Sequence, residues 1–372
     1  MKVLLCSPFS GKVGGISLWT KHMVTYFKNP DSDTDLTLVD AGRKYDIYPN
    51  MPLHERIAKG IKEYTGILKK VKQTLKTEKF DIVHLVSSAS ISLVKDYLIL
   101  RWAENKHIPT VIHFHFGRIP QIFKDKRWEL SLLKKVIGNA DRIVVIDPLS
   151  YQTLLDEGYT NVSFLPNPLS PDVVKTVHDH HSTERISSKI MFAGHVIPTK
   201  GIIELVDAFG NLNAAELHIL GAVTEEMKAT IIKRGGDRSD KIFVSGEKNH
   251  ETIIKEMLSS RIFVLPSYTE GFPNVILESM AAGCSIVSTN VGAVPEMLGI
   301  GSDKPCGIVV EPQNTEDLAA ALMKLLQDSE LADELAKNAV NKVTEDYHIE
   351  TVTQNLKDIW KDTLKSNYEN SK

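Results

Sequence analysis

The chain is poor in the features that mark several common classes of protein. Among its 372 residues are only three cysteines, Cys6, Cys284 and Cys306, which lie far apart and form no CxxC pair. This spacing argues against a disulfide framework, and we expect reduced, mostly buried thiols. The formal net charge is only −3, so no overall field attracts nucleic acid, and any basic surface must be local.

Long apolar runs are also lacking. The run in "MKVLLCSPFSGK" is too short for the core of a signal peptide, has no small-residue cleavage site after it, and favours a first strand. No window approaches the 18 uncharged apolar residues typical of a membrane span. We therefore expect a soluble, cytoplasmic protein.

What the sequence does contain is a repeated alternation of short apolar runs and longer amphipathic segments. The runs are rich in Val, Ile and Leu and do not alternate with polar residues, which is typical of parallel strands buried on both faces. The expected strands are 2–7, 35–41, 81–87, 110–116, 142–147, 189–195, 216–221, 241–246, 262–267, 285–289 and 307–312. The expected helices are 16–28, 54–77, 92–106, 200–210, 250–260, 274–282, 315–328 and 330–346.

This pattern predicts an α/β protein with two doubly wound parallel-sheet domains, since a hydrophobic content of 42% suffices for two cores. The segment 166–188, with three prolines and clustered histidines, is interpreted as the linker between them. We interpret His178, His180 and His181 as solvated linker residues rather than metal ligands, because no cysteines or rigid flanks accompany them. A last helix is expected at 349–366, and its pattern does not place it on either domain.

Candidate site residues follow directly after strands, where open α/β sheets bind their ligands. After the first strand, Gly11, Gly14 and Gly15 lead into a helix near Ile16, and a helix start suits an anionic or hydroxyl-rich ligand. Neither a dinucleotide fingerprint nor a Walker loop is present, so a plain tight turn stays open. Asp40, after the second strand, is a weak candidate for binding a ribose.

Three histidines belong to neighbouring strands of the first half. His115 lies at the mouth of the fourth strand and is the one we expect to reach a cleft. His113 is expected to be a hydrogen-bonded core residue and His84 a structural one. A zinc site built on two of them would need a third ligand.

In the second half, His195, Lys200 and Gly201 lie between a strand end and a helix start. A lysine here can neutralise a phosphate, which the helix start already favours.

The segment "EGFPNVILE" places Glu270 and Glu278 around a turn that leads into a helix. Pro273 suits an early helical position because its missing N–H is harmless there. Glu278 is positioned to take two ribose hydroxyls and Glu270 to accept from sugar hydroxyls, while a pair of glycosidase carboxylates is a competing interpretation. The turn leaves the backbone amides of Phe272, Asn274 and Val275 free to donate hydrogen bonds.

The segment "EGFPNVILESMAAGCSIVSTNVGAVPEML" resembles the donor-site signature of retaining glycosyltransferases of family 4, with two glutamates separated by seven residues. "FAGHVIPTKGIIELVDAF", "FLPNPL" and "GGIS" resemble further segments of that family. The resemblance implies the glycosyltransferase-B fold, with two Rossmann-like domains and a final helix that crosses back onto the first domain. It implies an acceptor-side domain at 1–168 with 349–372, and a domain at 169–348 that binds the nucleotide sugar.

The resemblance also implies roles for single residues. Lys200 would contact the donor diphosphate, Glu278 the ribose, and Glu270 the transferred sugar. The family commonly has arginine where this chain has His195, so either His195 is charged there or Lys200 supplies most of the neutralisation. Lys248 would border the base. The implied catalytic residues are His115, Lys200 and Glu270, and the implied donor site is Gly14, Gly15, His195, Lys200, Gly201, Lys248, Glu270, Gly271, Phe272, Pro273, Asn274, Val275 and Glu278.

By this resemblance we expect a retaining glycosyltransferase that moves a sugar from a nucleoside-diphosphate donor to a glycan or lipid-linked acceptor in surface polysaccharide or glycoconjugate synthesis. We expect no cofactor and no metal, and interpret "DSDTD" (31–35) as a solvated loop rather than a metal motif. A nucleotide-sugar 2-epimerase and a non-catalytic nucleotide-sugar-binding assembly subunit are the alternatives.

Two basic amphipathic stretches, 55–80 and 118–138, raise the question of a membrane-facing first domain. The first carries eight lysines and arginines against three glutamates. A charge-rich solvated helix is the plainer interpretation, whereas peripheral binding to an anionic surface at the inner membrane face would suit a lipid-linked acceptor.

Overall fold

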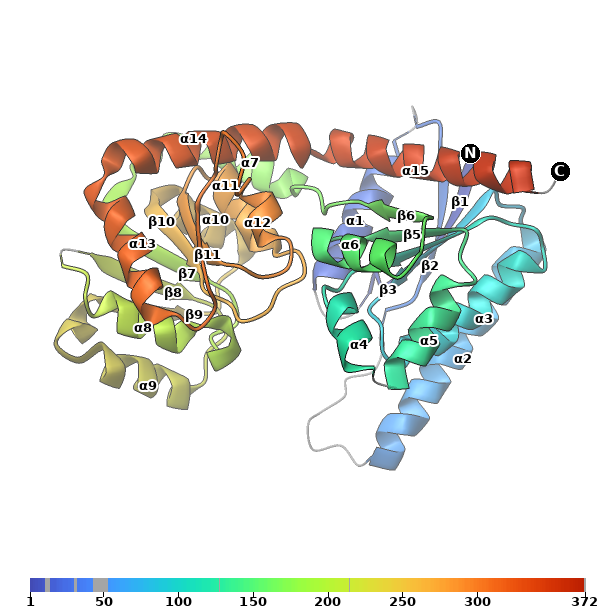
Figure 1. Ribbon diagram of the computed structural model, residues 1–372, viewed down its shortest axis with the longest axis horizontal. Coiled ribbons are helices and arrows are strands. Elements are labelled where there is room, and N and C mark those ends of the chain that lie inside the picture. Colours follow the sequence, from blue (N-terminus) through green and yellow to red (C-terminus); the bar gives the residue numbers. More distant parts are fainter. Residues whose placement is uncertain (11–13, 30–31, 43–52, 127, 214, 371–372) are drawn as a thin grey trace. The chain divides into compact units, whose positions relative to one another are not determined.

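The computed structural model describes residues 1–10, 14–29, 32–42, 53–126, 128–213 and 215–370. They fold into two compact units: unit 1 is Met1–Pro166 with Val352–Lys372, and unit 2 is Asn167–Thr351. Each unit holds a six-stranded parallel sheet with helices packed on it (Figure 1). The predicted fold class, α/β with two doubly wound parallel sheets, is confirmed.

The sheet of unit 1 has the strand order β2-β1-β3-β4-β5-β6. Its strands are β1 (Lys2–Ser7), β2 (Asp35–Asp40), β3 (Ile82–Ser87), β4 (Thr110–Phe114), β5 (Arg142–Val145) and β6 (Val162–Phe164). The helices that follow them are α1 (Gly15–Phe27), α2 (Leu53–Thr77), α3 (Ser92–Glu104), α4 (Ile119–Asp125), α5 (Trp128–Ile137) and α6 (Pro148–Asp156). Strands β3 and β4 are buried along their whole length, as their unbroken apolar runs predict.

The sheet of unit 2 has the order β12-β11-β10-β7-β8-β9, with β7 and β10 at its centre. Its strands are β7 (Ile186–Ala193), β8 (Glu216–Leu220), β9 (Ile242–Gly246), β10 (Ser260–Leu265), β11 (Ser285–Thr289) and β12 (Ile308–Val310). Its helices are α7 (Pro171–Asp179), α8 (Ile202–Phe209), α9 (Glu225–Gly235), α10 (His250–Ser259), α11 (Asn274–Ala281), α12 (Val294–Met297), α13 (Thr315–Gln327) and α14 (Ser329–Asp346).

The interpretation of 166–188 as the linker between the two domains is wrong in its middle. Residues 171–179 form α7, with Pro171 in its first turn, where a missing N–H costs nothing. The segment is helical because Val173 is fully buried, and α7 packs on α10 and α11. The short helices α4 and α6 and the three-residue strand β6 were also not predicted, since brief elements carry little periodicity.

The last helix, α15 (Ile349–Asn370), packs on unit 1 from Val352 onward. Trp360 is 1% exposed, and its indole N–H donates to Nδ1 of His84 over 2.9 Å. Lys357 forms an ion pair with Asp33 at 2.7 Å. None of the helices that the structure describes is both long enough and apolar enough to cross a bilayer.

Candidate functional site

In unit 2, the neighbouring strands β7 and β10 bring two predicted residues together at their carboxyl ends. Lys200 ends a short 3-10 helix (Pro198–Lys200) after β7, and Glu270 lies in the turn after β10. The Lys200 ammonium donates to Oε1 of Glu270 at 2.5 Å, with both side chains partly exposed. A cation and a carboxylate seventy positions apart thus form one polar pair at the sheet edge.

The loops that carry this pair are joined by their backbones. Gly201 has φ +68, and a Cβ there would lie 1.9 Å from the carbonyl oxygen of Pro266, so only glycine fits. Tyr268 joins the loops twice. Its N–H donates to the Thr199 carbonyl at 3.0 Å, and its hydroxyl donates to Glu204 at 2.6 Å. The Lys200–Glu270 geometry is therefore set by a rigid frame.

The turn that contains Glu270 is held from a second side by the segment that follows β11. At Gly292, which has φ +54, a Cβ would lie 2.4 Å from the Glu270 carbonyl oxygen. The N–H of Ala293 donates to the carbonyl of Gly271 at 2.8 Å. The trailing residues of the motif therefore have a structural role, which is to hold the turn.

Helix α11 begins at Asn274, and Pro273 is its N-cap with φ −75 and ψ 106. Pro273 therefore lies one residue outside the helix, not within its first turn as predicted. The first amides of a helix have no partner inside it, so those of Asn274 and Val275 remain able to bind a ligand. The Asn274 side chain accepts from Asn167 at 3.0 Å, and the Phe272 ring packs on Tyr347.

Glu278 lies on α11 with only 9% of its surface exposed. Its Oε1 is 3.0 Å from Nε2 of His250, the first residue of α10. This hydrogen bond and the nearby carboxylate raise the pKa of His250 above its usual value. Sequence reasoning missed His250. The only available signal was the position of His250 just after β9. The predicted residues Lys248, after β9, and His195, after β7, are both exposed.

In unit 1, the glycine loop opens helix α1. Gly14 is the N-cap, and its N–H donates to Oγ of Ser17 at 2.9 Å, whereas Gly11 lies outside the described residues. A Cβ added at Gly14 or Gly15 would meet nothing within 4 Å. The packing of the chain does not require glycine at these positions. The absence of side chains here leaves the start of the helix accessible to a ligand.

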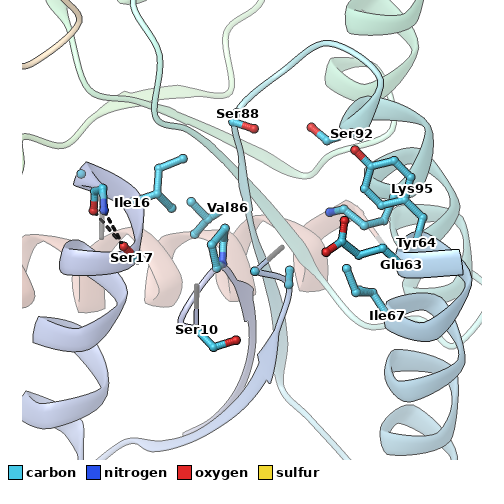
Figure 2. A pocket seen from close by; sticks show the side chains of 15 residues that line it. Ser10, Ile16, Ser17, Glu63, Tyr64, Ile67, Val86, Ser88, Ser92 and Lys95 are labelled. Carbon is cyan, nitrogen blue, oxygen red and sulfur yellow. Dashed lines mark hydrogen bonds between the residues drawn. The ribbon is translucent and has the colours of Figure 1, made fainter. Parts of the chain in front are cut away.

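A cavity of about 370 Å³ adjoins this loop. Figure 2 shows Ile16 and Val86 on one side of it, and Tyr64 and Lys95, from α2 and α3, on the other. The Lys95 side chain is 5% exposed and pairs with Asp96. The cavity thus combines an apolar wall with hydroxyl groups, the Glu63 carboxylate and one neutralised cation, a chemistry that suits a polyhydroxylated molecule.

Asp40 has a structural task in unit 1. Its carboxylate accepts from the backbone N–H groups of Phe9 (2.9 Å), Ser10 (3.3 Å) and Gly42 (2.8 Å), and from the Ser10 hydroxyl. These bonds hold the loops after β1 and β2 together and leave little of the carboxylate for a ribose.

His115 belongs to a packed cluster of rings. Its ring centroid lies 4.1 Å from that of His113 and 5.0 Å from that of Trp19, and His84 adjoins both Trp19 and His113. Burial lowers the pKa of His115, and that of His84, to about 3, and that of His113 well below its usual value. His113 differs from its predicted role, because neither of its ring nitrogens has a hydrogen-bond partner among the described residues.

Among the residues that the structure describes, no three histidine, cysteine or acidic side chains are arranged to hold a metal ion. His178 is exposed, and the described part of the 31–35 segment engages lysines: Asp33 pairs with Lys357 and Asp35 with Lys2.

Comparison with known proteins defines the class. The family model "Glycosyltransferase Family 4" matches residues 22–173, and the model "Glycosyl transferases group 1" matches residues 178–342. The chain belongs to these glycosyltransferases, and its two units have the glycosyltransferase-B fold.

Relatives and solved structures are consistent with that assignment. The chain is 24% identical over 345 residues to an uncharacterized glycosyltransferase of Methanocaldococcus jannaschii, covering 91% of this chain and 92% of the relative. It is 24% identical to the capsular polysaccharide biosynthesis glycosyltransferase CapM of Staphylococcus aureus over 51% of this chain and 50% of that one. The crystal structure of Anabaena HepE in complex with UDP matches with a TM-score of 0.71 and 16% identity, over 97% of this chain and all of that one.

Proposed function

We propose that this glycosyltransferase transfers a sugar from a nucleoside-diphosphate donor with retention of configuration, and that unit 2 binds the donor. The observation that carries the proposal is the pair Lys200–Glu270 beside the amino terminus of α11, with Glu278 one turn further along that helix. The cation would neutralise the diphosphate and Glu278 would bind the ribose. The crystallised complex of HepE with UDP supports a nucleotide ligand.

Cleavage of a sugar–diphosphate bond leaves a cationic sugar and an anionic diphosphate. Lys200 and the free amides at the start of α11 would stabilise the departing oxygens, because donors aimed at developing charge lower the barrier. Glu270, released from Lys200 by the diphosphate, would accept from hydroxyls of the transferred sugar. We propose same-face attack, with the leaving phosphate taking the acceptor proton, and activity that persists in a chelator.

We place the acceptor, a glycan or lipid-linked glycan, in the unit 1 cavity beside Gly14 and Gly15. The apolar wall at Ile16 and the hydroxyls around it suit a sugar ring, which has one apolar face and many hydroxyl groups. His115, whose pKa is lowered by burial, would meet the transferred sugar as an uncharged hydrogen-bonding group. The name of CapM supports a place in polysaccharide synthesis, which we assign to the cytoplasm.

A thermal-shift screen against UDP-, GDP- and ADP-sugars tests the donor site, because a ligand that binds the folded state raises the melting temperature. We expect one nucleotide class to raise it, and expect Lys200→Ala and Glu278→Gln each to weaken that ligand roughly ten- to a hundredfold, the loss typical of a hydrogen bond to a charged group. Lys228→Ala, at an exposed lysine of α9, is the matched control.

Incubation of the chain with the identified donor alone separates the alternatives. Appearance of an epimerised nucleotide sugar would identify a 2-epimerase. Donor binding without transfer or hydrolysis under any acceptor condition would indicate a non-catalytic subunit. An unchanged thermal shift in both Lys200→Ala and Glu278→Gln would overturn the proposed donor site.

A further inference from the structure

Helix α3 of unit 1 carries an apolar ridge on its outward face. Ile91, Val94 and Leu98 are 62%, 46% and 36% exposed, and their spacing of three and four residues places them on one side of the helix. The opposite side, with Leu93 and Leu100, is fully buried in the core. A contiguous exposed apolar patch on a soluble domain often marks an interaction site, and no described part of unit 1 covers this one.

An aromatic side chain extends the ridge. Trp128, the first residue of α5, is 66% exposed. Its neighbour Glu129 accepts from the backbone N–H of Ser90 at 2.7 Å, and Ser90 precedes Ile91. The hydrogen bond therefore places the start of α5, which carries Trp128, beside the start of α3. We call Ile91, Val94, Leu98 and Trp128 the α3 ridge.

A row of lysines flanks the ridge on the α2 side. Lys69, Lys72 and Lys76 are exposed and share one face of α2, since their spacing is again three and four residues. The Lys72 ammonium lies 5.5 Å from the ring centroid of Trp102 on α3, which places this lysine row beside that helix. In Figure 1, α2 and α3 lie side by side, as their contacts require. Within the described residues, none of the three lysines forms an ion pair with an acid.

We propose that the α3 ridge and the lysine row form a docking surface for an anionic lipid bilayer. Exposed aliphatic groups and a tryptophan suit the boundary between headgroups and acyl chains, and uncompensated lysines suit lipid phosphates. The charge complementarity points to this occupant. Symmetric pairing of two chains through the same surface would instead bring two lysine rows together without counter-charges.

Vesicle flotation of the full chain tests the charge component. We expect binding to vesicles of phosphatidylglycerol and phosphatidylcholine, loss of binding in 0.5 M salt, and little binding to phosphatidylcholine alone. The triple variant Lys69→Gln/Lys72→Gln/Lys76→Gln should partition roughly tenfold or more weakly. Lys228→Gln/Lys233→Gln/Lys337→Gln removes three exposed lysines of unit 2 and should bind like the parent.

Tryptophan fluorescence tests the apolar component. Trp128 is by far the most exposed of the four tryptophans described, since Trp19 and Trp360 are buried and Trp102 half-buried. We expect vesicles to shift the emission to the blue, and Trp128→Phe to remove that shift while flotation persists. Ile91→Ser/Leu98→Ser should reduce flotation, whereas Ile232→Ser/Val340→Ser, at exposed positions of α9 and α14, should not.

Flotation that stays unchanged in the triple lysine variant and in Ile91→Ser/Leu98→Ser would overturn the proposal, as would absence of binding to anionic vesicles. A concentration-dependent dimer in light scattering, lost in Ile91→Ser/Leu98→Ser, would identify a second copy as the occupant instead. The donor-induced thermal shift should be the same in all these variants. A failure of the proposed donor site can therefore be distinguished from a failure of the proposed membrane-docking surface.

Discussion

Glu278 shows how one side chain can serve both stability and binding. Its carboxylate is nearly buried and already accepts from His250 over 3.0 Å, so it meets a ribose as a partly satisfied acceptor. The protonated form of His250 is favoured in the folded state, which is why its pKa is raised. The pair therefore stabilises the fold most when the histidine is charged.

This pair predicts a pH dependence of stability. A raised pKa in the folded state means that the stabilisation is fully present below the ordinary histidine pKa of about 6.5 and is lost as pH rises through the raised value. His250→Asn should therefore melt below the parent at pH 5.5 and level with it at pH 9. The difference should stay below about 1 kcal/mol because the histidine is part-exposed.

Thermal unfolding of both proteins across that pH range measures this effect, with His178→Asn, at an exposed histidine of α7, as the control. A His250→Asn deficit of the same size at pH 5.5 and at pH 9 would show that the ion pair contributes nothing.

At the scale of elements, the glycines fall into two kinds that the sequence does not distinguish. Gly201 and Gly292 have positive φ, and backbone carbonyls occupy the place of a Cβ, so they hold the turns that carry Lys200 and Glu270. Gly14 and Gly15 have free space around them. The first kind serves the fold and the second leaves room at a helix start.

This difference predicts opposite results for two alanine substitutions. Gly201→Ala should destabilise unit 2 by about 2–4 kcal/mol, because it combines strained φ with a backbone clash. Gly15→Ala should leave stability unchanged or raise it by up to about 1 kcal/mol, since alanine favours a helix, yet it should lower transfer activity at least several-fold.

Urea unfolding and initial rates measured on the same preparations separate the two effects. Full activity in Gly15→Ala would show that no ligand approaches this loop closely.

At the scale of the whole molecule, tryptophan fluorescence follows the unfolding of unit 1 alone, because all four tryptophans lie in that unit. The same unit contains three histidines whose pKa is lowered by burial, His84, His113 and His115. A histidine with a depressed pKa in the folded state stabilises the fold above its ordinary pKa, and this stability is lost as pH falls below about 6.5.

Unit 1 should therefore unfold more easily in mild acid. Below pH 6, each of these histidines should lower the free energy of unfolding by up to about 1.4 kcal/mol per pH unit, because the unfolded chain binds its proton and the folded chain does not. Urea titrations followed by tryptophan fluorescence between pH 4.5 and 7 measure the slope. His115→Gln should reduce it by about one proton, and a variant with the parental slope would refute the assignment.

Much of this structure could be predicted from local pattern. The strands β1 and β11 begin and end where expected, because an unbroken apolar run is the direct consequence of burial on both faces. The positions of Lys200, Glu270 and Glu278 next to strand and helix ends could be predicted for the same reason. Helix α7 was missed although Ser170, Pro171 and Asp172 mark a helix start, because the prolines and histidines of the segment favoured a linker. His250 could not be predicted, since nothing local marks a histidine whose partner is 28 positions away.

Periodicity in the amino-acid sequence was enough to locate most of the strands, several of the helices and the residues at the carboxyl ends of the strands, because it reflects how each segment is buried. Only the tertiary structure decided which of those residues meet. The order of strands in a sheet places β10 beside β7, and thereby Glu270 against Lys200. The tertiary structure also leaves the α3 ridge exposed beside the lysine row. A local sequence pattern does not predict this, because it does not show which elements pack against each other.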